Sequence, residues 1–147
     1  MAYATQADLL NQLTEQELIE LTDDASTGAV DAAKVNAAIA KGDADIDGYC
    51  RGRYALPLVA SEKVKSLSVD LAIYYLEQRR RSIREVTQQA YDNAVDYLEK
   101  VAKGTVALDQ PPSSVQTTEL DVVTPDRTEQ EDKLKFGSGP GENLEDY

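Results

Sequence analysis

Apolar residues recur at intervals of three and four over most of the first hundred positions, which is the period of an amphipathic helix. The period predicts three long helices, from Ala32 to about Arg53, from Glu62 to about Arg81 and from Ile83 to about Lys103. The predicted apolar faces, in chain order, are Val35, Ile39, Ile46 and Tyr49; Val64, Leu67, Leu71, Tyr74 and Tyr75; and Val86, Ala90, Ala94, Leu98 and Val101. Gly104 suits the end of the third helix.

Two shorter helices are predicted ahead of these, one after Thr5 to about Leu13 and one from Glu15 to about Thr22. Glu17 follows Thr14 at the spacing of a capping box, in which each side chain bonds to the other's backbone N–H. Residues suited to cap a helix N-terminus precede four of the five helices: Thr5, Thr14, Asp31 and Ser61. We therefore expect an all-α fold, a small helical bundle of three long and two short helices.

The composition changes near Asp109. Residues 109–147 hold four of the five prolines, and ten acidic against three basic residues give this segment a net charge of −7. We predict two parts, a helical body over residues 1–108 and an acidic arm containing Pro and Gly over residues 109–147. The run Val115–Val123 has strand character but no hairpin partner, so we expect an extended arm that forms a strand only on assembly, against another chain.

Composition also excludes several functions. The chain has 147 residues and no histidine, which removes catalytic triads and metal sites built on imidazole. A net charge of −12 argues against general binding to nucleic acid, whose affinity depends on Lys and Arg. Cys50 is alone, and no apolar run reaches the roughly 18 residues of a membrane span. We expect a cytoplasmic protein that is not an enzyme, has no metal or cofactor and contacts no membrane.

The one basic cluster is formed by Arg79, Arg80, Arg81 and Arg84, at the junction of two predicted helices. Cations at a helix C-terminus complement the helix dipole, so a structural turn and a docking patch are equally good interpretations. As a docking patch it suits an acidic protein surface better than DNA, for example the arm of a neighbouring subunit. The apolar arm residues expected to make such contacts are Val115, Leu120, Val122, Val123 and Phe136.

Two further motifs are open to a structural and a functional interpretation. Arg51, Arg53 and Tyr54 precede a proline-fixed turn and are candidates for protein contacts, although a role in ending the helix explains them better. The run from Asp43 to Gly48 matches the start of an EF-hand calcium loop, but the twelfth position, which needs a glutamate, is Tyr54. We interpret this run as the acidic face of a helix.

Four segments together resemble a known family. They are Met1–Leu10, Glu17–Asp23, Ala44–Leu58 and Asp70–Tyr74, the last ahead of the arginine cluster. In this order they resemble the Mu-like tailed-phage proteins that join head to tail, known as connectors or head-completion adaptors. The resemblance covers about residues 1–108 and leaves the arm outside.

The resemblance implies a helical adaptor without catalytic activity. It would assemble as a homo-oligomeric ring, a dodecamer, below the portal protein in the virion neck, and would contact the next neck or tail protein. Packaged DNA would pass through without specific binding, and assembly would take place in the host cytoplasm. Two alternatives remain: a small DNA-contacting regulatory protein that uses the arginine cluster, and a small cytoplasmic enzyme based on carboxylates.

Overall fold

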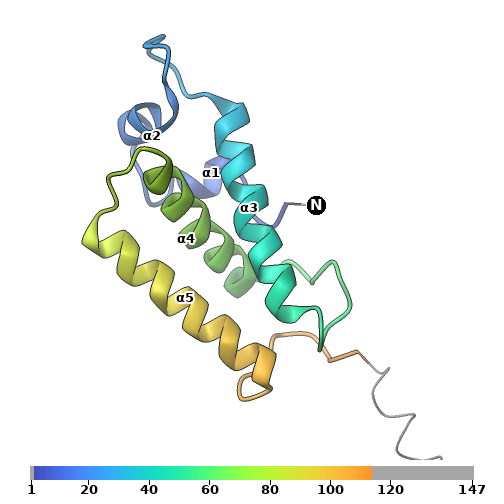
Figure 1. The fold of residues 1–147 in the computed structure, drawn as a ribbon. Helices are drawn as coiled ribbons and strands as arrows, with labels where there is room; N and C mark the ends of the chain where they lie inside the picture. The colour runs from blue at the N-terminus through green and yellow to red at the C-terminus, as the bar shows by residue number, and fades with distance from the viewer. Residues whose placement is uncertain (1, 114–147) are drawn as a thin grey trace, which may run out of the picture. The chain divides into compact units, whose positions relative to one another are not determined.

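The described part of the chain contains five α-helices. Figure 1 shows how they are arranged. The computed structural model describes residues 2–113. The chain divides into two units, Met1–Pro112 and Ser113–Tyr147, and the described residues belong to the first unit apart from Ser113. The helices are α1 (Gln6–Leu9), α2 (Glu15–Thr22), α3 (Ala32–Cys50), α4 (Glu62–Arg79) and α5 (Glu85–Lys103). The predicted all-α bundle of three long and two short helices is confirmed, and no strand occurs among residues 2–113.

Side chains cap four helix N-termini as predicted. Thr5 and Thr14 each form a complete capping box, with Asp8 and Glu17 as the reciprocal acids. The side chain of Asp31 accepts from two backbone N–H groups at the start of α3, and Ser61 accepts from the N–H of Val64. The predicted caps therefore fix where α1 to α4 begin.

Four helices are shorter than their periodicity predicts. α1 stops at Leu9 instead of Leu13, because residues 10–12 form a turn in which the N–H of Leu13 returns to the carbonyl of Leu9. α3 stops at Cys50 instead of Arg53 because its next residues turn back onto the Cys50 carbonyl, which accepts the N–H groups of Arg53 and Tyr54. α4 stops at Arg79, ahead of a left-handed residue described below. α5 begins at Glu85 instead of Ile83, because Arg84 ahead of it has an extended backbone.

The apolar face of α5 differs from the predicted one by one position. Its buried residues are Thr87, Ala94, Leu98 and Val101, whereas Val86 is 78% exposed. Thr87, not Val86, lies in helical register with Ala94, Leu98 and Val101. Placing Val86 in the core was therefore wrong, and this valine lies on the surface.

The core consists of two clusters that share α3 and α4. One lies between these helices and α5, and is centred on Ile46, Leu71 and Leu98, all fully buried. The other lies between α3, α4 and the two short helices, and includes Leu9, Leu18, Val35 and Leu76. Figure 1 shows α4 lying between α3 and α5 along its length. Because both clusters depend on α3 and α4, the contact between these two helices organises the body.

Gly42 marks the closest approach of α3 to α4. A Cβ atom at this position would lie 2.9 Å from the Cβ of Leu71, closer than two carbons can approach without movement. One residue further along α3, the buried carboxylate of Asp43 accepts a hydrogen bond from the hydroxyl of Ser68 on α4. Glycine thus permits the contact, and a buried hydrogen bond fixes its register.

Tyr3 fastens the N-terminal segment to this contact. Its backbone N–H donates to Asp43 Oδ2 at 2.9 Å, and its hydroxyl donates to Asp47 Oδ1 at 2.6 Å. The same hydroxyl oxygen accepts the N–H of Leu58 at 3.1 Å, so one side chain joins the N-terminus, α3 and the segment before α4. Burial, together with the bond to Asp47, raises the pKa of Tyr3 to about 12.

Substituting Gly42 by Ala tests the close contact between α3 and α4. We expect a loss of about 1–2 kcal/mol of unfolding free energy. The cost of moving the helices apart to fit the new methyl group exceeds the gain from alanine's better helix propensity. The matched control is Gly48→Ala on the same helix, where nothing lies within 4 Å of the new Cβ. This control should gain up to about 1 kcal/mol. Urea unfolding at neutral pH measures both, and changes of the same sign would contradict the contact.

Candidate functional site

The turn from α4 to α5 carries the arginine cluster and ends α4 with a Schellman motif. The N–H of Arg81 donates to the carbonyl of Gln78 at 2.9 Å, and the N–H of Ser82 donates to that of Glu77 at 3.2 Å. This motif needs a residue in the left-handed region, and Arg81 has φ 59°. The same pair of bonds ends α5, but there the left-handed residue is Gly104, with φ 84°. Arginine therefore occupies a position that favours glycine.

Arg79 and Arg80 attach the end of α4 to the loop that follows α2. The guanidinium of Arg79 donates to both oxygens of Asp24, at 2.8 and 2.9 Å, and to the carbonyl of Leu21. Arg80 donates to the same carboxylate at 3.1 Å. The hydrogen bonds and charge of Arg79 lower the pKa of Asp24 to about 2. These two arginines thus stabilise the turn by bonds on the surface to acceptors of the same chain.

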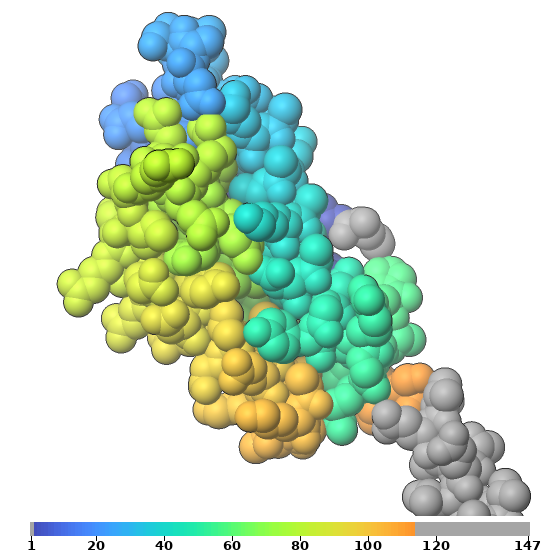
Figure 2. All heavy atoms as spheres, viewed as in Figure 1, coloured from blue at the N-terminus to red at the C-terminus, as the bar shows by residue number. Residues whose placement is uncertain are grey.

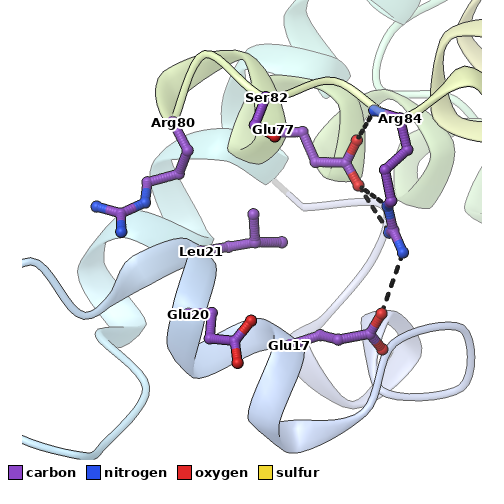
Figure 3. A pocket seen from close by; sticks show the side chains of 7 residues that line it. All are labelled: Glu17, Glu20, Leu21, Glu77, Arg80, Ser82 and Arg84. Atoms are coloured by element: carbon purple, nitrogen blue, oxygen red, sulfur yellow. Dashed lines mark hydrogen bonds and ion pairs between the residues drawn. The ribbon is translucent and has the colours of Figure 1, made fainter.

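Arg84 joins a buried acid to an exposed one, as Figure 3 shows. Its Nε donates to Glu77 Oε1 at 2.7 Å, and its backbone N–H donates to Glu77 Oε2 at 3.0 Å. Glu77 is 1% exposed, and these hydrogen bonds compensate its carboxylate for the loss of water. The same guanidinium reaches Glu17 on α2 at 3.1 Å. Arg84 is the N-cap residue of α5, and its contacts therefore link the start of α5 to α2 and α4.

These residues surround a pocket of about 380 Å³. Figure 3 shows Arg80 and Arg84 on opposite sides of it, with the side chain of Leu21 between them. The pocket is lined by Glu17, Glu20, Leu21, Glu77, Arg80, Ser82 and Arg84. Since most of its charges pair with one another, the pocket is suited to hold the turn in place rather than to bind a free anion. In the described part of the chain, the side chain of Arg81 has no ion pair, which sets it apart from its three neighbours.

The segment after α3 is mostly structural. Tyr54 is 2% exposed, and its hydroxyl oxygen accepts the N–H of Leu108, so it lies in the core and holds the chain that follows α5. The Arg53 guanidinium packs on Gly104, where its charge faces the negative end of the α5 dipole. Arg51 is exposed. The predicted role of this segment in ending the helix agrees with the geometry, and a contact with a partner stays a prediction for Arg51 and Arg53.

The acids of the EF-hand-like run serve the fold. Asp43 and Asp47 accept hydrogen bonds from Tyr3, and Asp45 accepts one from the hydroxyl of Tyr75. Burial raises the pKa of Asp43. Within residues 2–113 no group of three or more acidic or cysteine side chains is arranged to hold a metal ion. These aspartates thus face their own chain's tyrosines.

The five arm residues with predicted contacts cannot be placed, because Val115, Leu120, Val122, Val123 and Phe136 lie outside the described residues. The body does continue past Leu108, since the side chain of Gln110 accepts the N–H of Val59 at 2.6 Å.

Among the helices of residues 2–113, none has the length and apolar character to cross a membrane.

Sequence reasoning missed the acids that engage the arginines: Asp24, Glu17 and Glu77. Asp24 and Glu17 lie more than fifty residues away along the chain, so no local pattern could pair them. Glu77 did carry a signal, because it is an acid among the apolar positions of α4, next to the arginine cluster. A buried acid beside several arginines indicates an internal ion pair.

Comparison with known proteins identifies the family. Residues 3–124 match the family described as "Bacteriophage Mu, Gp36". The chain belongs to this family. One relative of the Mu Gp36 family, the Mu-like prophage FluMu protein gp36 of Haemophilus influenzae, is 32% identical over 107 residues, which are 72% of this chain and 74% of the relative. The predicted resemblance to Mu-like phage proteins is confirmed at this level, and the matched region extends past the body into the arm.

Arg81 and Gly104 allow a paired test of the two helix ends in this Mu Gp36 family protein. Arg81→Gly should raise the unfolding free energy by about 1 kcal/mol, because glycine adopts the left-handed conformation without a steric penalty. Gly104→Ala should lower it by about the same amount, since its Cβ would also lie 2.8 Å from a guanidinium nitrogen of Arg53. Thermal and urea unfolding of both variants measure the changes. Destabilisation by Arg81→Gly would show that the arginine side chain holds the turn.

The pairing of Asp24 with Arg79 predicts a dependence of stability on pH. The pKa of Asp24 in the folded state, about 2, lies below its ordinary value, so its contribution is complete above about pH 4 and disappears as the pH falls toward 2. Asp24→Asn should therefore be less stable than the parent protein at pH 7, and the difference should shrink between pH 4 and pH 2. Urea midpoints across this range measure it, and a constant difference would argue against the ion pair.

Proposed function

We propose that this protein is a structural virion protein that joins the phage head to the tail. In this proposal twelve copies form a ring below the portal protein, extend the channel through which DNA leaves the head, and present a surface to the next neck or tail protein. The protein reaches the virion neck after assembly in the host cytoplasm. Membership of a Mu phage family over residues 3–124 is the observation that carries the proposal.

The surface of the body supports assembly from identical copies. Large apolar side chains remain exposed at Val86, Val59, Leu10 and Ile83. Val86 borders a groove of about 240 Å³ whose floor includes Leu13, Ile73 and Ala90. This groove on one copy and a different exposed apolar side chain on the next, such as Val59, would make a heterologous contact, which closes into a ring when the rotation between copies fits.

The charge of the protein supports a channel through which DNA passes without binding. The whole chain carries −12, and three of the four clustered arginines pair with Asp24, Glu17 or Glu77 of the same chain. A regulatory protein would need such arginines free to neutralise phosphates, which gives that alternative no support from the geometry. An acidic wall repels the DNA backbone instead.

The proposal is tested by mixing the purified protein with the portal protein of the same phage. Mass photometry should show the portal ring gaining the mass of twelve chains. Val86→Asp should remain folded, because an acid in the first turn of α5 is favoured by the helix dipole, yet should reduce binding of further copies at least about tenfold. Asn93→Asp adds the same charge at another exposed position of α5 and should assemble normally.

A portal ring that gains no mass would contradict the connector role. If the Val86→Asp and Asn93→Asp variants assemble equally well, the ring proposal stands, but this groove does not belong to the interface between copies.

A further inference from the structure

A second groove, between α3 and α4, differs from the others in its charge. It has a volume of about 300 Å³ and is lined by Lys34, Ala37, Ala38, Lys41, Tyr75, Leu76, Gln78 and Arg79. Its lining contains three cations and no acid, whereas four other grooves on residues 2–113 are each lined by at least one carboxylate. Figure 2 shows the face on which α3 and the second half of α4 lie side by side.

Positive charge around this groove exceeds the negative charge that the body supplies. Asp24 is shared by Lys34, Arg79 and Arg80, and Lys34 also contacts Asp31. Lys41 forms an ion pair with none of the described residues and lies over the ring of Tyr75, 4.3 Å from its centroid. The groove is therefore a local basic site on an acidic protein, with an apolar floor formed by Ala38 and Leu76.

We propose that this groove binds the acidic arm of a second copy of the chain, through the run Glu119–Val123. This run interleaves the acids Glu119 and Asp121 with Leu120, Val122 and Val123. Its carboxylates complement the cationic rim, and its apolar side chains complement the floor. The contact rests on the self-assembly proposed above and deepens it. It moves the predicted acceptor of the arm from the arginine cluster to an adjoining groove that shares Arg79 with the cluster.

The groove lies toward the opposite end of α4 from the point where the chain leaves the body. The chain leaves the body beside Val59, close to the start of α4, where Gln110 accepts the Val59 N–H. The groove involves the last turns of α4, about 20 Å further along the helix at about 1.5 Å per residue. An arm that leaves at one end of a body and binds at the other end of the next body forms a head-to-tail contact, which is the kind that builds rings.

Cross-linking between isotope-labelled chains tests this contact on the full-length protein. Unlabelled and ¹⁵N-labelled chains are mixed in equal amounts, treated with a carbodiimide that joins amines to carboxylates, and analysed by mass spectrometry after digestion. We expect Lys41 joined to Glu119 or Asp121, with light–heavy pairs as frequent as light–light and heavy–heavy pairs together. Absence of these links, or links only within one isotope, would overturn the proposal.

A charge reversal with a matched control completes the test. Lys41→Glu should weaken self-association in sedimentation velocity about tenfold, because it places like charges in contact. Lys63 lies over the ring of Tyr97 at the same 4.3 Å but outside the groove, so Lys63→Glu should leave self-association unchanged. Adding Glu119→Lys and Asp121→Lys to the Lys41 variant should restore association. Equal effects of the two lysine reversals, or no rescue, would overturn the proposal.

The outcome is independent of the connector role. If the portal ring gains the protein but no Lys41 cross-link forms, the groove proposal fails and the connector role stands. If the cross-links form but no portal complex does, the connector role fails and the groove contact stands.

Discussion

The close contact between α3 and α4 at Gly42 is the constraint on which the rest of the body depends. Both core clusters share these helices, and the buried bond from Ser68 to Asp43 fixes their register one residue away. Asp43 in turn positions Tyr3, which holds the N-terminal segment and the residues before α4. The body is thus stabilised by a short series of buried polar contacts around one glycine.

Local chemistry explains which features could be predicted from the sequence. Helix existence and the caps at Thr14 and Asp31 depend on neighbouring residues, so periodicity and capping rules identified them. The one-position error at Val86 arose because a valine and a threonine compete for the same face, and only packing decides between them. The partners of the arginines lie far away along the chain, and no local pattern identifies them.

The acidic residues of this protein have two roles, which its net charge of −12 alone does not reveal. Within the body, acids such as Asp24 and Glu77 neutralise arginines and hold the turn between α4 and α5. That pairing leaves positive charge concentrated at the groove beside Lys41 and at Arg81, which keeps a conformation suited to glycine. In the proposed ring these cations meet acids of other chains, and the remaining acidic surface faces the DNA.

The most direct test of the connector role is electron microscopy of particles produced by the phage when the gene for this chain is deleted. The account predicts heads filled with DNA and complete free tails that do not join, with joining restored when purified protein is added to the extract. Joined, infectious particles in the absence of the protein would contradict it.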